Sequence, residues 1–186
     1  MSFLLVVTGP PGAGKSTVAS LVADRVAPSA LVSGDAFFDF IVNGRIPPWL
    51  PEAHEQNELV TKTAGAAAGR YARAGFATVY DGVLGPWFLP TFAVATGLHE
   101  LGYVVLLPDV ESCVRRVARR QGHRFRDESA TRQLHRGFAS AAIDRKHVLV
   151  DPPERPEEVA DLVVRKLDAG DLRVEARGAT GGEAKE

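Results

Sequence analysis

The sequence of 186 residues contains only one cysteine, Cys113. A single thiol excludes an intramolecular disulfide and disfavours a metal site built from cysteines, so we expect a protein of the reducing cytoplasm. No apolar run reaches the roughly 18–20 residues that a membrane-spanning helix needs. The apolar run at residues 3–8 has no basic leader, and we expect it to be a buried strand, not a signal peptide.

An excess of one charge sign is also absent, because 22 basic residues face 23 acidic ones. This balance provides no general attraction to nucleic acids or anionic membranes, so we expect neither as a partner. The length suits one domain, which we assign to residues 1–170. Residues 171–186 are polar and end in a glycine-rich segment, so we predict a flexible tail. Monomer and homodimer both remain open.

What the sequence does contain is a glycine-rich motif directly after the first apolar run. Residues 9–17 match G-x-x-x-x-G-K-[S/T], and an amphipathic stretch follows them. A strand, a glycine-rich turn and a helix form the context of a phosphate-binding loop, in which backbone N–H groups surround phosphate oxygens. We predict that nucleotide phosphates are bound by Gly9, Pro10, Pro11, Gly12, Ala13, Gly14, Lys15, Ser16 and Thr17. Lys15 would reach the β- and γ-phosphates, and the Ser16 hydroxyl would ligate Mg²⁺.

Four further apolar runs alternate with helical patterns, and this alternation predicts parallel βαβ units. The predicted strands are 3–8, 30–33, 77–80, 103–107 and 147–150; the predicted helices are 15–27, 52–74, 87–100, 110–120, 127–140 and 154–168. The expected fold is an α/β domain of three layers, with a five-stranded parallel sheet flanked by helices, as in P-loop nucleoside triphosphate hydrolases. Ligands of such a fold bind beyond the carboxyl ends of the strands.

Two aspartates follow predicted strands at that edge. Asp35 comes after the second strand, where its carboxylate would orient or deprotonate an attacking hydroxyl. The alternative is that it caps a helix over residues 36–42. Asp81 follows the third strand and is a candidate for magnesium or acceptor binding, or else an ordinary turn residue before a glycine. A third acid, Asp109, is best interpreted as a helix N-cap.

Arginines cluster between residues 115 and 136. An apolar stripe at Val110, Cys113, Val114 and Val117 predicts the buried side of a helix, which leaves Arg115, Arg116, Arg119 and Arg120 on its surface. Planar guanidinium groups suit the oxygens of a migrating phosphoryl group. We therefore predict a short arginine-rich lid at about residues 121–127, with Arg120 and Arg116 as catalytic residues and Arg124 near the substrate. The alternative is a solvated helix face.

These motifs resemble those of small-molecule P-loop kinases over roughly residues 3–168. The stretch from Arg116 to His123 is similar to the lid entry of gluconate kinases, and Ser33, Gly34 and Asp35 resemble their aspartate after the second strand. Shikimate kinases and chloramphenicol phosphotransferases share the layout. The resemblance implies that ATP is the nucleotide and that Arg115 or Arg116 stacks on its base.

The sequence departs from gluconate kinases around the expected acceptor site. Aromatic residues replace polar ones after the second and third strands, namely Phe37, Phe38, Phe40, Trp87 and Phe88. A sixth aromatic residue, Trp49, belongs to the run of residues 45–50, which resembles a run in that family. Such residues line an aromatic acceptor pocket or belong to the core. We assign Asp35, Phe38, Trp49, Asp81, Trp87 and Arg124 to substrate binding.

The sequence therefore predicts an ATP- and Mg²⁺-dependent phosphotransferase that acts on a hydroxyl of a small molecule. A sugar acid, an aromatic alcohol or an antibiotic would each serve as acceptor. A nucleoside or nucleotide kinase is the closest alternative, and a non-catalytic nucleotide-binding or ATPase module is a second.

Overall fold

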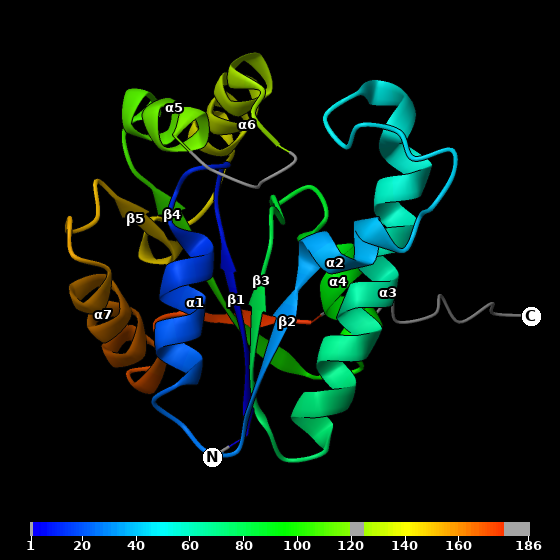
Figure 1. Cartoon of the computed structure of the whole chain (residues 1–186). Helices are drawn as coiled ribbons and strands as arrows, with labels where there is room; N and C mark the ends of the chain where they lie inside the picture. Colours follow the sequence, from blue (N-terminus) through cyan, green and yellow to red (C-terminus); the bar gives the residue numbers. More distant parts are fainter. Residues whose placement is uncertain (1, 120–124, 177–186) are drawn as a thin grey trace, which may run out of the picture.

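The computed structural model describes residues 2–119 and 125–176, and a parallel sheet runs through its centre (Figure 1). The strands are β1 (Phe3–Thr8), β2 (Ser29–Ser33), β3 (Ala77–Asp81), β4 (Glu100–Leu107) and β5 (Val148–Val150), in the order β2-β3-β1-β4-β5. Each neighbouring pair in this order is parallel. All five predicted strands are thus confirmed, and β1 occupies the centre.

Helices cover both faces of the sheet, as the alternation of elements predicted. α1 (Lys15–Ala23) and α7 (Pro156–Asp168) pack on one face, and α3 (His54–Arg73) and α4 (Leu89–Thr96) pack on the other (Figure 1). Alternate residues of β1 serve the two layers, because Leu5 packs toward α1 while Leu4 packs toward α3. Side chains buried on both faces explain why this strand is a continuous apolar run.

A sixth strand corrects the predicted boundary of the tail. β6 (Arg173–Glu175) pairs antiparallel with the first half of β4, and the preceding Leu172 is fully buried. Leu172 and Val174 alternate with charged residues, which is the pattern of a half-buried strand, but its short length made it look like polar tail. The assignment of residues 171–176 to a flexible tail was therefore wrong, and residues 177–186 lie outside the described part.

Shorter elements surround the carboxyl ends of the strands. They are α2 (Gly34–Asp39), the 3₁₀ turn η1 (Pro51–Ala53) before α3, α5 (Val110–Ala118), α6 (Glu128–Ser140) and the 3₁₀ turn η2 (Arg145–His147). Asp109 caps α5 by accepting a hydrogen bond from the Ser112 N–H at 2.9 Å, as predicted. Arg132 of α6 holds α5 through two hydrogen bonds to the Glu111 carboxylate, at 2.5 and 2.9 Å.

None of the helices in the described ranges is both long and apolar enough to cross a membrane.

Helices α3 and α4 approach each other closely where α3 carries glycines. A Cβ atom built on Gly69 would lie 2.0 Å from the carbonyl oxygen of Thr96, and one on Gly65 would lie 2.7 Å from that of Phe92. Both neighbours are backbone atoms, which cannot rotate away. The glycines that weaken the helical pattern of α3 therefore serve its packing.

We predict that Gly69→Ala destabilises the fold although alanine is the better helix former. Overpacking against rigid backbone costs about 1–3 kcal/mol, which exceeds the ~1 kcal/mol gained in helix propensity. The free energy of unfolding, measured by urea denaturation, should fall. The reverse exchange Ala66→Gly, at an exposed position of the same helix, serves as the control for propensity alone. An increase in stability for Gly69→Ala would contradict the close packing.

Cys113 lies at the point where α5 meets the glycine-rich loop. Its side chain is fully buried, and a Cβ atom on Gly12 would lie 2.3 Å from its carbonyl oxygen. Burial raises the pKa of the Cys113 thiol to about 11. The raised value disfavours the thiolate, which is the reactive form.

We therefore predict that Cys113 resists thiol reagents while the protein is folded. Near pH 8 about a thousandth of such a thiol is ionised, against roughly a quarter of an ordinary cysteine. Labelling by a chromogenic disulfide should be at least about a hundredfold slower in native protein than in guanidinium, and should accelerate as the pH rises toward the raised pKa. Equal rates in both states would show that the thiol is accessible.

Candidate functional site

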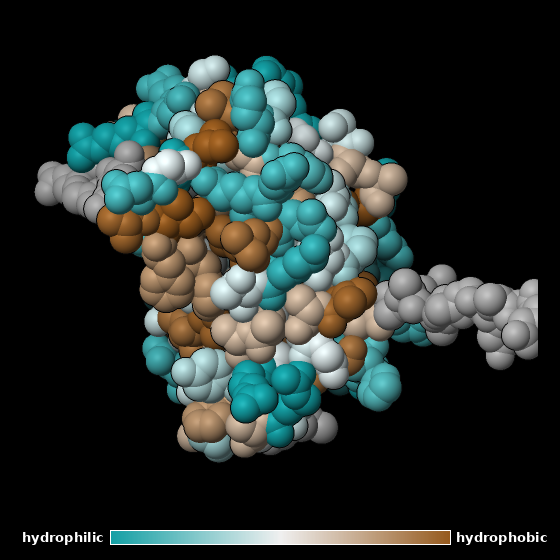
Figure 2. Space-filling view, turned by 90° about the vertical axis from the view of Figure 1, so that its right-hand side faces the viewer, coloured by the Kyte–Doolittle hydropathy of each residue, from teal (hydrophilic) through white to brown (hydrophobic). Residues whose placement is uncertain are grey.

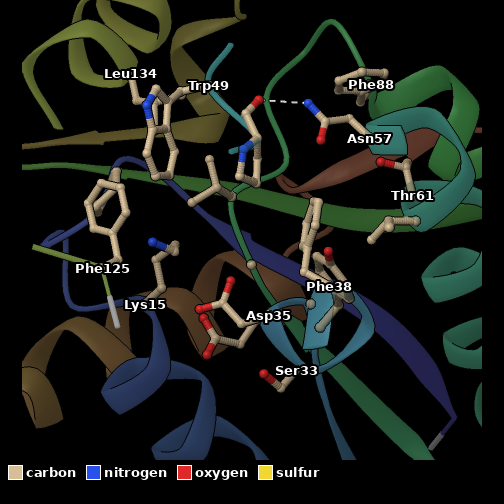
Figure 3. A pocket seen from close by; sticks show the side chains of 18 of the residues that line it. Lys15, Ser33, Asp35, Phe38, Trp49, Asn57, Thr61, Phe88, Phe125 and Leu134 are labelled. Atoms are coloured by element: carbon tan, nitrogen blue, oxygen red, sulfur yellow. Dashed lines mark hydrogen bonds between the residues drawn. The ribbon is translucent and has the colours of Figure 1, made fainter. Parts of the chain in front are cut away.

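A cavity of about 610 Å³ opens beyond the carboxyl ends of β1, β2 and β3. The glycine-rich loop and the start of α1 form one wall, and α2, α3 and the segments beside them form the opposite wall (Figure 3). This is the edge of the sheet where the fold class places ligands. The main sequence motif and the largest group of predicted substrate residues therefore meet in one cleft.

The glycine-rich loop has the backbone conformation that its composition predicted. Gly9, Gly12 and Gly14 all have positive φ angles, of 143°, 82° and 93°. The Gly9 backbone also packs against β4, where a Cβ atom would lie 2.2 Å from the Leu106 carbonyl oxygen. Directly after this loop α1 begins at Lys15, so its N-terminal N–H groups face the cavity.

Lys15 and Ser16 both line the cavity. The Lys15 ammonium donates a hydrogen bond to the Pro10 carbonyl oxygen at 3.0 Å, and its side chain is largely buried. A lysine folded over its own loop lies where an incoming phosphate would be held. The Ser16 hydroxyl is exposed at the start of α1, as a magnesium ligand must be.

Asp35 and Asp81 line the same cavity from the adjacent strands β2 and β3. The register pairs Ser33 with Asp81, which brings the two strand ends together. Asp35 and Lys15 both point into the cavity (Figure 3). The capping alternative for Asp35 was wrong, because α2 starts earlier than predicted: Ser33 is its N-cap residue, and Asp35 lies in the first turn.

Tyr80 also lines the cavity, near enough to feel the charges of both carboxylates. Burial, together with the nearby charges of Asp35 and Asp81, raises the pKa of this phenol. The hydroxyl therefore stays protonated over the physiological range. Sequence reasoning did not select Tyr80, because Tyr80 belongs to the apolar run of a buried strand and was interpreted as a core residue.

The residues at this end of the cavity fit a magnesium ion. Ser16, Asp35 and Asp81 offer hydroxyl and carboxylate oxygens, the hard ligands that Mg²⁺ prefers. Within the described ranges, no three His, Cys, Asp or Glu side chains form a metal-binding group by themselves. An ion shared with nucleotide phosphates and water suits this donor set better than a cage made only of protein.

The six aromatic residues divide between the cavity and other places. Phe38, Trp49, Trp87 and Phe88 line the cavity, as the pocket alternative predicted. Phe37 packs against the core, and Phe40 is 71% exposed. On the face that carries α3, several groups of apolar side chains reach the surface (Figure 2). The exposed apolar residues of α2, α3 and the segment between them include Phe40, Val42, Leu50 and Leu59.

Of the four arginines assigned to the site, the structure describes two. Arg116 donates a hydrogen bond to the Gly12 carbonyl oxygen at 3.3 Å, so it touches the loop. Arg115 instead bonds to Ser112 of its own helix at 2.7 Å, and neither arginine lines the cavity. Arg120 and Arg124 lie outside the described residues. Roles for these side chains in nucleotide binding or catalysis stay predictions.

Sequence reasoning missed several residues that line the cavity. Asn57 and Thr61 line the cavity from one face of α3, and Phe125 contacts the Trp49 ring edge-on at 5.1 Å between ring centroids. The polar pair at positions i and i+4 interrupts the apolar stripe of Val60, Ala64 and Ala68, and this interruption was the available signal. Phe125 could not be found in this way, because it lies in an irregular segment.

Solved structures share the fold at low sequence identity. A sugar kinase from Janibacter sp. HTCC2649 is 22% identical, with a TM-score of 0.71 over 90% of this chain and 95% of that one. The APS kinase CysC of Mycobacterium tuberculosis, in complex with AMPPNP and APS, is 17% identical, with a TM-score of 0.68 over 90% and 98%. A gluconokinase from Sinorhizobium meliloti 1021 is 18% identical, with a TM-score of 0.62 over 91% and 93%.

A search of curated proteins found no match. A family profile described as "AAA domain" matches residues 4–142, a span that holds the glycine-rich loop, Asp35, Asp81 and α5. Since that match covers well over half of the sequence, the chain belongs to this AAA-domain family of P-loop proteins.

Proposed function

We propose that this protein is an ATP- and Mg²⁺-dependent kinase that transfers the γ-phosphate to a hydroxyl group of a small molecule. The observation that carries the proposal is that Lys15 and Asp35 line one cavity (Figure 3). A phosphate-binding loop alone would suit any nucleotide-binding protein. A carboxylate in the same cavity, whose volume is about 610 Å³, adds a place for a second substrate.

The two walls of the cavity would have different roles in the reaction. The loop N–H groups and Lys15 would hold the phosphates, and Asp35 would accept the proton of the acceptor hydroxyl or hold its oxygen in line. The acceptor oxygen forms a bond to the γ-phosphorus while the bond to the bridging oxygen of ADP breaks. When bound, Mg²⁺ neutralises charge on the phosphate oxygens, and Ser16 would hold it with Asp81 or Asp35 close by.

The similar solved structures support this proposal at the level of the fold. The neighbours are named as kinases of small molecules, and the APS kinase was solved with an ATP analogue. For this chain, ATP as the nucleotide and the arginine-rich lid are parts of the proposal. So are the single domain, the cytoplasmic location, the absence of a nucleic-acid or membrane partner, and a monomeric or homodimeric state.

A nucleoside or nucleotide kinase is the second candidate. The aromatic wall formed by Phe38, Trp49 and Phe88 favours it, since nucleobases stack on such rings. An ATPase module without an acceptor would leave this wall unexplained, and it would release ADP at the same rate whether or not an acceptor is present.

We predict that Lys15→Ala lowers acceptor-dependent ADP release by at least about a thousandfold, because the cation that neutralises the β- and γ-phosphates is lost. A coupled assay of ADP release measures this effect. Lys146→Ala removes an exposed lysine outside the cavity and is the matched control. Undiminished turnover in Lys15→Ala would defeat the proposed role of the loop.

We predict a different effect for Asp35→Asn. Turnover should fall about a hundredfold or more, because the amide cannot accept the proton, whereas ATP affinity measured by calorimetry should change little. Asp168→Asn, at the exposed end of α7, is the control. Turnover that survives nearly intact would assign Asp35 to the structure of α2 instead of the chemistry.

A further inference from the structure

Aromatic rings line the part of the cavity that the phosphates leave free. Phe38 lies on one side, and Trp49 and Phe125 lie on the other (Figure 3). Each ring has a partner that fixes its position: the Arg45 guanidinium lies 5.6 Å from the Phe38 centroid, and the Trp49 and Phe125 rings contact each other. A space between fixed aromatic walls suits a flat, apolar ligand.

We call the wall formed by α2, α3 and the segments beside them the acceptor wall. The charges along it disfavour an acceptor molecule that carries a carboxylate. Asp35, Asp39 and Asp81 all line the cavity. The lining residues in the described part of the chain include only two cations, Lys15 and Arg45. Lys15 belongs to the phosphate end, and the Arg45 guanidinium already bonds to the Asp39 carboxylate at 2.7 Å. Among the described lining residues, a carboxylate on the acceptor would therefore meet negative charge and no cation that is not already engaged.

The far end of the acceptor wall is polar. The Asn57 amide nitrogen donates a hydrogen bond to the Pro48 carbonyl oxygen at 2.7 Å, which fixes the orientation of the amide. Its buried carbonyl oxygen has no hydrogen-bond partner among the described residues. One turn further along α3, Thr61 turns its hydroxyl toward the cavity (Figure 3). A buried oxygen that accepts no hydrogen bond raises the free energy of the folded protein. This end of the cavity therefore suits a ligand that supplies a hydrogen-bond donor.

Resting on the proposed kinase function, we infer that the acceptor is a flat aromatic alcohol without a carboxylate. Its ring carries an N–H or O–H donor that faces Asn57 and Thr61, and its alcohol lies near Asp35. Both nucleosides and phenolic alcohols have this chemistry. The sugar acids and shikimate-like acids do not, because they lack the ring face and add the charge that this wall disfavours.

The experiment compares four acceptors in ADP release with ATP and Mg²⁺: thymidine, para-hydroxybenzyl alcohol, gluconate and shikimate. At least one of the first two should exceed both acids in kcat/KM by about a hundredfold. A preference for thymidine identifies the nucleoside source, and a preference for the benzylic alcohol identifies the other. Equal or better turnover of either acid would overturn the inference while leaving the kinase function intact.

Binding is measured separately by tryptophan fluorescence with ADP present. The chain has only two tryptophans, and both line the cavity, so quenching reports directly on the proposed site. Saturable quenching by a flat alcohol without phosphorylation would retain the inferred ligand class and reject the kinase function. Binding of the acids alone, or of none of the four compounds, would overturn the inference.

Donor recognition is tested by pairing probes with variants. Methylation of the ring nitrogen of thymidine, or of the phenol of para-hydroxybenzyl alcohol, should weaken binding to wild type about tenfold or more. Thr61→Val and Asn57→Leu should each reduce that difference. Thr63→Val is the matched control, because the Thr63 hydroxyl is exposed and bonds to the Leu59 carbonyl oxygen at 2.9 Å. An unchanged methylation penalty in both test variants would remove the polar pair from acceptor recognition.

Discussion

The structure depends on the close fit of the glycine-rich loop between β4 and α5. Gly9 lies against the Leu106 carbonyl and Gly12 against that of Cys113, and neither place has room for a Cβ atom. This contact turns the loop backbone into a concave surface and directs Lys15 and the start of α1 into the cavity. Backbone packing therefore defines the position that we propose for the phosphates.

The wall opposite the glycine-rich loop is positioned by two kinds of contact. Asp35 and Asp81 come from strand ends whose register is set by the sheet, so their positions are nearly as constrained as the loop. Phe38, Trp49 and Thr61 come from α2, an irregular segment and α3, none of which is part of the sheet. The fold therefore determines where the proposed phosphate site and the carboxylates lie, while local packing determines the shape and polarity of the proposed acceptor end.

This difference explains what the sequence could predict. The strands, the glycine-rich loop and the Asp109 cap depend on local patterns, and each was read correctly. β6 was missed because its three residues are paired only through a distant strand, β4. Six aromatic residues were named, but no local pattern separates Phe38 in the cavity from Phe37 in the core. Asn57 interrupts the apolar stripe of α3, which was a weak signal, but its buried carbonyl oxygen without a partner among the described residues is seen only in the folded chain.

The difference between the two walls also explains how proteins can share this fold while the side chains of the acceptor wall differ. Solved kinases match over nine tenths of this chain although fewer than a quarter of the residues are identical. The phosphate end depends on backbone geometry, which tolerates such divergence as long as a few glycines remain. The acceptor end depends on side chains, and an exchange of one aromatic ring or one ion pair such as Arg45 with Asp39 alters it without disturbing the sheet. If the proposed function holds, acceptor specificity can therefore change while the fold and the phosphate end stay the same.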